Sequence, residues 1–281
     1  MKTVLLDAGN TAVKWRIVSP DGPWSDADPR GTIPVGTPRL AEELQDACKA
    51  AGCSLSDAAG CCVAPQSVQD TIDRATIAAL GRPVRWLTAA TRFEAPGISL
   101  RNGYRDPTQL GADRWHALIG ARAVRPRGTL LVVSAGTATT VDTLTDDGRF
   151  VGGVIAPGIR LMHDSLARGT ARLPRADGAY RPHPDNTGDA MQTGIIDAQI
   201  GLIERRIGRI RVDRAAASVR GDDADDRAIH VLLSGGNAEL LYKAWADAQA
   251  CDPAATAVVR SVEPDLVLRG LRLRSTREPP T

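Results

Sequence analysis

The sequence predicts an α/β protein built from two similar domains in tandem. Its 281 residues and 29.7 kDa are long for one simple domain and sufficient for two. Both halves begin with a short apolar strand, a glycine-containing turn and a second strand. Both then continue through a third strand to a helix, so the order of elements repeats although the sequence does not. We expect a central cleft between two such domains, where ligand sites concentrate.

The composition is that of a globular enzyme and excludes several other classes. Hydrophobic residues make up 43% of the chain and charged residues 24%, which excludes global disorder. The net charge of +2 lacks the basic excess of a dedicated nucleic-acid-binding protein. No run of 18 apolar residues occurs, and the N-terminal apolar run is too short for a signal peptide. The five cysteines lack metal-finger spacing, so we expect reduced thiols in a cytoplasmic protein. From the charge and the short apolar runs, we expect no nucleic acid partner and no membrane contact.

Strands and helices of the first half follow from apolar alternation, helical spacing and the Gly and Pro residues at their ends. The spacing of Leu40 and Leu44 predicts a helix with Thr37 as its N-cap, ended by Gly52. Residues 88–109 lack periodicity and are predicted to be a working loop. In order, we expect strands at 3–6, 13–18 and 32–35, a helix at 38–51, a strand at 59–64, a helix at 66–80, a strand at 84–87 and a helix at 110–124.

The second half is interpreted in the same way. Residues 172–187 are rich in Pro and predicted to be irregular, and residues 214–227 have little to bury, so we expect a flexible insertion there. We place the first domain at residues 1–115 and the second at 116–281. In order, we expect strands at 129–133, 138–144 and 150–155, helices at 158–168 and 189–210, a strand at 229–233, a helix at 238–249 and a frayed tail at 275–281.

Two glycine turns stand at equivalent places in the two halves, one in Asp7–Lys14 and one in Ser134–Asp142. Such turns expose successive backbone N–H groups that can bind phosphate, and Asp7 could hold a hydrated divalent cation. An ordinary hairpin with a capping Asp would look the same, so it is the pairing of the turns that favours a clamp for a nucleoside triphosphate. The candidate ATP-binding residues are Asp7, Ala8, Gly9, Asn10, Thr11, Lys14 and Thr137.

A third candidate segment opens a helix after the long loop. It consists of Gly111, Ala112, Asp113 and Arg114, preceded by Tyr104. A carboxylate next to a guanidinium suits a general base beside an anion clamp. The alternative is a first-turn Asp that complements the helix dipole, with the arginine solvated.

Taken together, these motifs resemble those of the type III pantothenate kinases. The family's D-x-G-N-[ST]-x-x-K motif is matched by Asp7–Lys14, and its G-x-D-R motif with an upstream Tyr is matched by Gly111–Arg114 and Tyr104. Its [DS]-x-G-T-A-x-T-x-D motif is matched by Ser134–Asp142, and a later N-T pair by Asn186 and Thr187. The matched motifs extend over most of the chain.

The resemblance implies two RNase H-like domains of the actin-like ATPase superfamily. It implies transfer of the ATP γ-phosphate to the 4'-hydroxyl of pantothenate, the first step of coenzyme A biosynthesis. Asp113 would then be the catalytic base, Arg114, Tyr104 and Thr187 would bind pantothenate, and Asp7 would hold Mg²⁺. The family forms homodimers and uses K⁺ or NH₄⁺. Many members bind that cation with an Asp where this chain has Ser134, whose neutral hydroxyl attracts K⁺ less strongly.

Two alternative functions share part of this pattern. Another small-molecule kinase of the superfamily would keep both phosphate motifs but would not need Gly111–Arg114 with Tyr104. A non-catalytic transcriptional accessory protein would be free to lose Asp7, Lys14 and Asp113, all of which are present.

Overall fold

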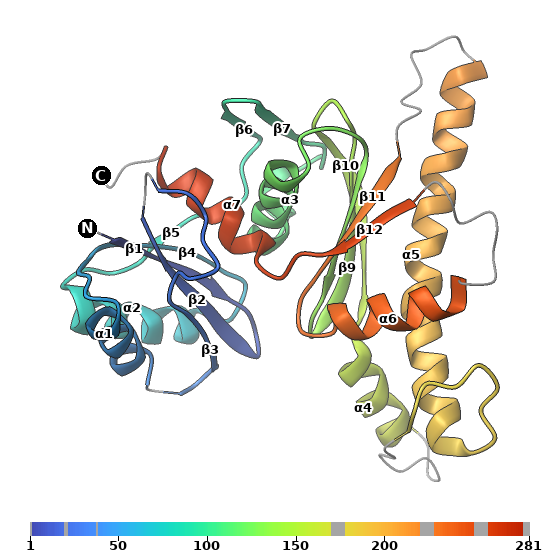
Figure 1. Cartoon of the computed structure of the whole chain (residues 1–281), viewed down its shortest axis with the longest axis horizontal. Helices are drawn as coiled ribbons and strands as arrows, with labels where there is room; N and C mark the ends of the chain where they lie inside the picture. Colours follow the sequence, from blue (N-terminus) through green and yellow to red (C-terminus); the bar gives the residue numbers. More distant parts are fainter. Residues whose placement is uncertain are drawn as a thin grey trace. The chain divides into compact units, whose positions relative to one another are not determined.

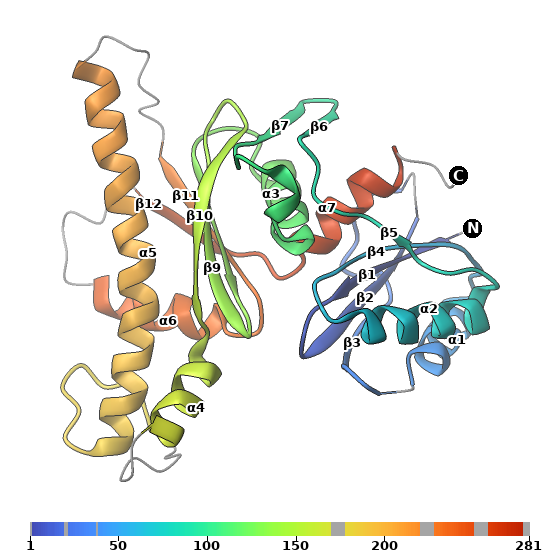
Figure 2. The same cartoon turned by 180° about the vertical axis from the view of Figure 1, so that it is seen from behind.

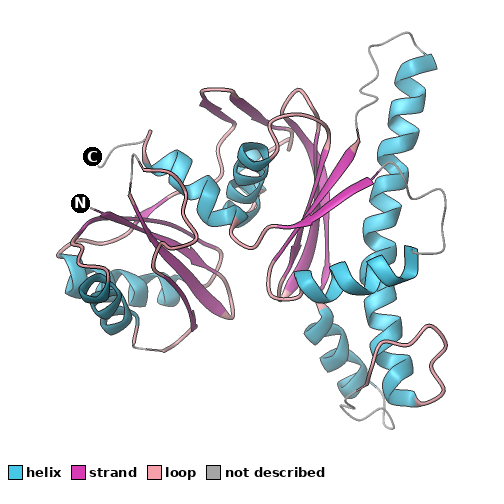
Figure 3. Ribbon diagram, viewed as in Figure 1, coloured by secondary structure: helices cyan, strands magenta, loops and turns pink. Residues whose placement is uncertain are grey.

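The computed structural model describes residues 2–19, 22–37, 39–169, 178–219, 228–249 and 258–277 (Figure 1). The chain forms two compact α/β units, in agreement with the predicted fold class (Figure 3). The first unit comprises Met1–Val124 and Asp265–Thr281, and the second comprises Arg125–Pro264. Within the described ranges, no helix is both long enough and apolar enough to cross a membrane.

The first unit contains a mixed sheet with the strand order β3-β2-β1-β4-β5. The strands β1, β2 and β3 are antiparallel neighbours, while β4 and β5 run parallel to β1. A hairpin of β6 and β7 and a single 3-10 turn precede α3. The elements are β1 (Lys2–Ala8), β2 (Ala12–Val18), β3 (Arg30–Pro34), α1 (Leu40–Ala50), β4 (Leu55–Cys62), α2 (Gln66–Leu80), β5 (Arg85–Trp86), β6 (Arg92–Ala95), β7 (Ile98–Asn102), the 3-10 turn (Pro107–Gln109), α3 (Ala112–Val124) and α7 (Leu266–Ser275).

Alternation along β1 sends its side chains to two differently covered faces. Val4 and Leu6 pack in the cluster covered by α1 and α2 (Figure 1). Leu5 packs instead with Leu268 and Leu271 of α7. Asp7 follows Leu5 by two positions, so the fold directs its side chain toward the face on which α7 packs.

The helices α3 and α7 approach each other through two glycines. A Cβ atom on Gly120 would lie 2.0 Å from the carbonyl oxygen of Leu266, and one on Gly270 would lie 1.9 Å from that of His116. The backbones therefore touch where these helices cross, which fixes the position of the first turn of α3.

The second unit repeats the topology of the first. Its strands follow the order β12-β11-β8-β9-β10, with β8, β9 and β10 antiparallel and β11 and β12 parallel to β8. The helices α5 and α6 cover one face of this sheet through a core that includes Ile203 and Trp245 (Figure 2). The elements are β8 (Leu130–Ala135), β9 (Ala138–Leu144), β10 (Arg149–Pro157), α4 (Ile159–Gly169), α5 (Thr187–Val219), β11 (Ile229–Ser234), α6 (Ala238–Gln249) and β12 (Val258–Val262).

The structure differs from the sequence-based prediction in the first half at three points. Thr37 does not cap α1, whose N-cap is Arg39; Thr37 lies instead in the preceding turn, where its N–H donates to the Pro34 carbonyl. The predicted loop at 88–109 contains the β6–β7 hairpin, which turns at Gly97 with a φ of 73°. The units divide after Val124 rather than after residue 115, because α3 stays intact and packs on α7.

Two further differences lie near the C-terminus. The helix α5 continues to Val219, so residues 214–219 of the expected insertion are helical, and residues 220–227 lie outside the described residues. No element was expected between 250 and 274, where the structure has β12 and α7. Of the tail expected at 275–281, residues 278–281 lie outside the described residues.

Candidate active site

The first phosphate motif forms the tight turn between β1 and β2. The Gly9 N–H donates to the Ala12 carbonyl oxygen at 3.0 Å and closes the bend. Asn10 and Thr11 are exposed at its tip. Asp7 and Lys14 are direct cross-strand partners below the turn, so the ladder places a carboxylate beside an ammonium on one face.

Asp7 lies among charged and polar groups contributed by four other elements. Burial raises the pKa of its carboxyl from 3.8 to about 6, Lys14 lowers that pKa, and the Asp113 and Asp265 carboxylates raise it. The Cys61 thiol of β4 donates to Asp7 Oδ1 at 3.9 Å. Because the Asp113 carboxylate raises the pKa of Asp7, the Asp7–Lys14 turn and the Gly111–Arg114 segment lie near each other within this unit.

Asp113 occupies the first turn of α3, which begins against the α7 face of the sheet through Ala112. Its Oδ1 atom accepts a hydrogen bond from the Arg114 N–H at 2.8 Å. The same atom would lie 2.6 Å from a Cβ on Gly111. The glycine of the G-x-D-R motif therefore makes room for the aspartate that follows it.

Arg114 is not the solvated side chain of the alternative interpretation. It is 5% exposed, and its Nη1 atom donates to the Tyr104 hydroxyl at 3.1 Å. The guanidinium also lies 5.7 Å from the centre of the Tyr104 ring. Asn102 holds this loop, because its side chain accepts from the Tyr104 N–H and donates to the Pro107 carbonyl. The predicted substrate residues Tyr104 and Arg114 are thus paired.

The second phosphate motif forms the equivalent turn between β8 and β9. The Gly136 N–H donates to the Ala138 carbonyl at 3.1 Å, as Gly9 does in the first unit. The start of α4 closes on this turn, since the Gly158 N–H donates to the Thr137 carbonyl at 3.0 Å. A Cβ on Gly158 would lie 2.3 Å from the Gly136 carbonyl oxygen, so only glycine allows this approach.

A third backbone segment of the second unit reaches the same place. The Asn237 N–H donates to the Ala135 carbonyl at 3.1 Å, and Gly235 adopts a φ of 97° against that residue. The Ser234–Asn237 turn, the β8–β9 turn and the start of α4 therefore meet at one end of the sheet. Ser134 stands two residues before its turn glycine, as Asp7 does, and the Ser134 hydroxyl replaces the carboxylate at the equivalent position.

Asn186 and Thr187 lie at the start of α5 in the second unit. The Asn186 Oδ1 atom accepts from the Asp189 N–H at 2.9 Å and caps the helix. Thr187 is the first helical residue and is exposed. Asp142, the last residue of the second motif, is 2% exposed and accepts from the Thr140 hydroxyl at 3.4 Å.

Comparison with known proteins decides the family. The chain matches the type III pantothenate kinase family over residues 3–209. It belongs to that family. A type III pantothenate kinase from Laribacter hongkongensis is 39% identical over 244 residues, which cover 85% of this chain and 88% of that one. Another, from Azoarcus sp., is 42% identical over 215 residues, or 74% of each chain.

Solved structures confirm the fold. A Campylobacter jejuni protein of the Baf family aligns with a TM-score of 0.53 and 17% identity, over 96% of this chain and 95% of that one. A Sinorhizobium meliloti protein described as a 2-dehydro-3-deoxygalactonokinase aligns with a TM-score of 0.51 and 16% identity, over 96% of each chain. At this identity the likeness extends to the architecture alone.

Sequence reasoning missed three residues around Asp7 in this pantothenate kinase family member. Cys61 was expected to be an inert buried thiol, yet it bonds to Asp7. The Asp265 carboxylate forms an ion pair with Arg16, with 2.6 Å between Asp265 Oδ2 and Arg16 Nη2. The Arg16 side chain on β2 is fully buried. Alternation along β4 could have placed Cys61 on the Asp7 face, whereas Asp265 comes from a segment about 250 residues away and left no local signal.

Proposed function

We propose that this chain is an ATP-dependent pantothenate kinase that transfers the γ-phosphate of ATP to the 4'-hydroxyl of pantothenate, the first step of coenzyme A biosynthesis. The observation that carries the proposal is the convergence of Asp113, Asp7 and the Tyr104–Arg114 pair within one unit of a chain of this family. Phosphoryl transfer depends on positioning and charge neutralisation more than on covalent help, and such groups supply both.

In the proposed acceptor site, Asp113 takes the proton of the attacking hydroxyl. The carboxylate is already oriented by the Arg114 N–H and held beside Gly111 and Ala112. Arg114 and Tyr104 bind the substrate carboxylate, because the guanidinium offers paired donors and the phenol adds a third. Thr187 is proposed to bind the same substrate through its hydroxyl.

Each of the two turns is proposed to bind phosphate oxygens of the nucleotide. In the first turn the N–H groups and the Lys14 ammonium neutralise phosphate charge, and in the second turn Thr137 donates to phosphate. The residues assigned to this role are Asp7, Ala8, Gly9, Asn10, Thr11, Lys14 and Thr137.

The residues present fit a Mg²⁺ ion that is held largely by ATP. Among the described residues no cluster of three His, Cys, Asp or Glu side chains could hold a metal by itself. Mg²⁺ usually binds one or two carboxylates together with phosphates and water, and Asp7 with Asp113 nearby is such a set. When bound, the ion would neutralise phosphate charge, and Asp7 would hold it directly or through water.

Three finer properties also belong to the proposal. Ser134 contributes one neutral oxygen toward K⁺ or NH₄⁺, so activation by these ions is expected to be weak and is measured by titrating each into the assay. We propose a homodimer, which sedimentation would report as twice 29.7 kDa. A cytoplasmic location follows from the substrates and is tested by cell fractionation.

The deciding experiment is a coupled assay of ADP release with ATP, Mg²⁺ and pantothenate. In the Asp113→Asn variant, kcat should fall by about 10²-fold or more because the general base is lost, while ATP binding persists. Asp46→Asn, which removes an exposed carboxylate on α1, is the matched control and should leave kcat unchanged. Unaltered turnover in Asp113→Asn would overturn the role given to this residue.

A panel of other alcohols in the same assay separates the proposal from the alternatives. Turnover with a sugar or a hydroxy acid, but not with pantothenate, would indicate another small-molecule kinase. Absence of turnover with every acceptor, together with a stable protein or promoter complex, would indicate an accessory protein.

A further inference from the structure

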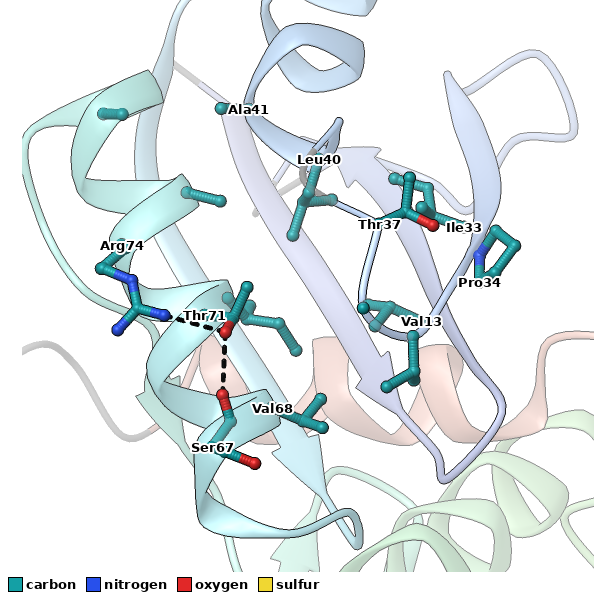
Figure 4. A pocket seen from close by; sticks show the side chains of 15 residues that line it. Val13, Ile33, Pro34, Thr37, Leu40, Ala41, Ser67, Val68, Thr71 and Arg74 are labelled. Atoms are coloured by element: carbon teal, nitrogen blue, oxygen red, sulfur yellow. Dashed lines mark hydrogen bonds between the residues drawn. The ribbon is translucent and has the colours of Figure 1, made fainter.

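A cavity in the first unit lies apart from the residues of the proposed reaction. Its volume is about 470 Å³, within the range of pockets that hold small ligands. It opens between β2, β3, α1 and α2 (Figure 4). Its wall belongs to the cluster that contains Val4 and Leu6, so it lies on the side of the sheet opposite Asp7. Nothing in the kinase mechanism uses it.

The wall of this cavity is mostly apolar. Val13 comes from β2, Ile33 from β3, Leu40 from α1, and Val68 and Ile72 from α2. Four elements thus supply branched aliphatic side chains without an aromatic ring. This surface matches an aliphatic chain better than a flat heterocycle, which would use stacking.

One charged side chain, Arg74 on α2, lines the cavity. Its Nη2 atom donates to the Thr71 hydroxyl at 3.0 Å, and that hydroxyl donates to the Ser67 carbonyl at 2.8 Å (Figure 4). Because a guanidinium has five N–H donors, this contact leaves others to bind an anion.

The acidic neighbours of Arg74 on α2 face other partners. Asp70 accepts from the Gln66 amide, and Asp73 accepts from the Trp86 indole and the Val84 N–H. Among the residues that the structure describes, no carboxylate forms an ion pair with Arg74. The cavity therefore combines an aliphatic wall with a cation that is available to a ligand.

We propose that this cavity binds an aliphatic monocarboxylate, with its chain between α1 and α2 and its carboxylate on Arg74. An alkylammonium would place like charges together, and a compact anion such as phosphate would gain nothing from the apolar wall. The proposal is independent of the kinase reaction, since none of these residues belongs to the proposed substrate sites.

The cavity wall is continuous with the first phosphate turn. Val35 lines the cavity, and its N–H donates to the Thr11 carbonyl at 2.9 Å. Val13 lines it as well and precedes Lys14 on β2. A ligand that orders β2 and β3 would therefore also order the turn between β1 and β2. We expect the Val35 and Gly9 amides to exchange hydrogen more slowly when the ligand is bound.

Isothermal titration of the full chain with octanoate, below its micelle concentration, tests the proposal directly. We expect saturable binding with one site per chain. Arg74→Gln should weaken it about tenfold, since a charge-assisted hydrogen bond is lost. Arg82→Gln, which removes an exposed arginine just beyond α2, is the matched control and should bind as the parent does. Octylammonium should not bind, and butyrate should bind much more weakly than octanoate.

A second variant fills the cavity instead of removing its charge. Ala75 lines the wall, and Ala75→Phe should abolish octanoate binding while ATP still binds, which also reports that the first unit is folded. Slower exchange at Val35 on adding octanoate gives a readout that needs no variant. Equal binding by the parent, Arg74→Gln and Ala75→Phe, or no saturable binding by the parent, would overturn the proposal.

Discussion

At the scale of single residues, the candidate site places several carboxylates close together around the buried Asp7, where burial disfavours the ionised form. Burial and the Asp113 and Asp265 carboxylates raise the pKa of Asp7, and Lys14 offsets this only in part. A site of this kind suits the binding of a polyphosphate with its cations, because incoming positive charge relieves the repulsion. Function and stability are therefore expected to conflict at these positions.

The first test of this conflict is the stability of Asp7→Asn. The folded state raises the pKa of Asp7 from 3.8 to about 6, so it binds this proton more tightly than the unfolded state does. The contribution of this group to stability is present below pH 4 and is lost as the pH rises through about 6. In metal-free buffer at pH 7, Asp7→Asn should therefore be more stable than the parent, by on the order of 2 kcal/mol.

Urea denaturation of both proteins between pH 4 and pH 7 measures this difference. The gap should open between pH 4 and pH 6 and stay constant above. A variant that is less stable than the parent at pH 7 would contradict the expectation. The same variant should lose kinase activity, because the carboxylate proposed to hold Mg²⁺ is gone.

Gly111 gives a second prediction at this scale. Since a Cβ there would lie 2.6 Å from Asp113 Oδ1, Gly111→Ala should displace the carboxylate without disturbing the core. We expect kcat to fall by about tenfold or more, with the melting temperature nearly unchanged. Steady-state kinetics and calorimetry check the two parts, and an unchanged kcat would show that Asp113 tolerates the displacement.

Single residues were predictable where a local motif identified them. Asp7, Lys14, Asp113 and Arg114 stand in short motifs that single them out in the sequence, and in the structure the Asp113 carboxylate raises the pKa of Asp7. Cys61, Asp265 and Arg16 reach the same site through packing between distant segments. In the sequence, Cys61 and Arg16 look like ordinary strand residues and Asp265 like an ordinary residue before a helix. None of the three stands in a motif that would assign it to the site.

At the scale of elements, α3 and α7 set the geometry of the proposed acceptor site. Gly120→Ala would place a methyl group 2.0 Å from the Leu266 carbonyl oxygen, so the helices would have to separate. We expect a loss of about 1–3 kcal/mol in unfolding free energy, together with lower activity, because Asp113 moves with α3. Gly201→Ala on α5 is the matched control. Its Cβ would meet nothing within 4 Å, and it should stabilise slightly.

Chemical denaturation of Gly120→Ala and Gly201→Ala measures the change in unfolding free energy that each substitution causes. Equal changes in stability would mean that helix propensity, rather than the close approach of α3 to α7, governs Gly120.

Elements with regular local patterns were predicted well. The bounds of α2 and of α6 agree with the structure, since each has helical spacing and α2 ends at Gly81 in the left-handed conformation. The helix α7 was missed because three arginines and a central glycine obscure its apolar face, and only the packing against α3 explains that glycine. The β6–β7 hairpin was missed because its strands are short and largely exposed.

At the scale of the whole molecule, the two units share the same topology. The first unit is built from two segments of the chain, because the chain enters it again at Asp265 after forming the second unit. The repeat was predictable because the same succession of strands and helices occurs in both halves of the sequence. The return was not, since sequence periodicity reports neighbours along the chain and not which unit a terminal helix joins. Leu268 and Leu271 of the C-terminal helix α7 thus complete a core that includes Leu5 of β1.

A chain that ends at Pro264 tests the importance of this return. It keeps every strand of both sheets but loses Leu268 and Leu271 from the core, and it leaves the buried Arg16 without the Asp265 carboxylate. Breaking such a pair costs about 3–5 kcal/mol even before the apolar contacts are counted. Hydrogen exchange should therefore show protection lost throughout residues 2–124 and retained in 125–264. Equal protection in the full-length and shortened proteins would mean that the first unit is stable without α7, and equal loss in both units would mean that they do not unfold separately.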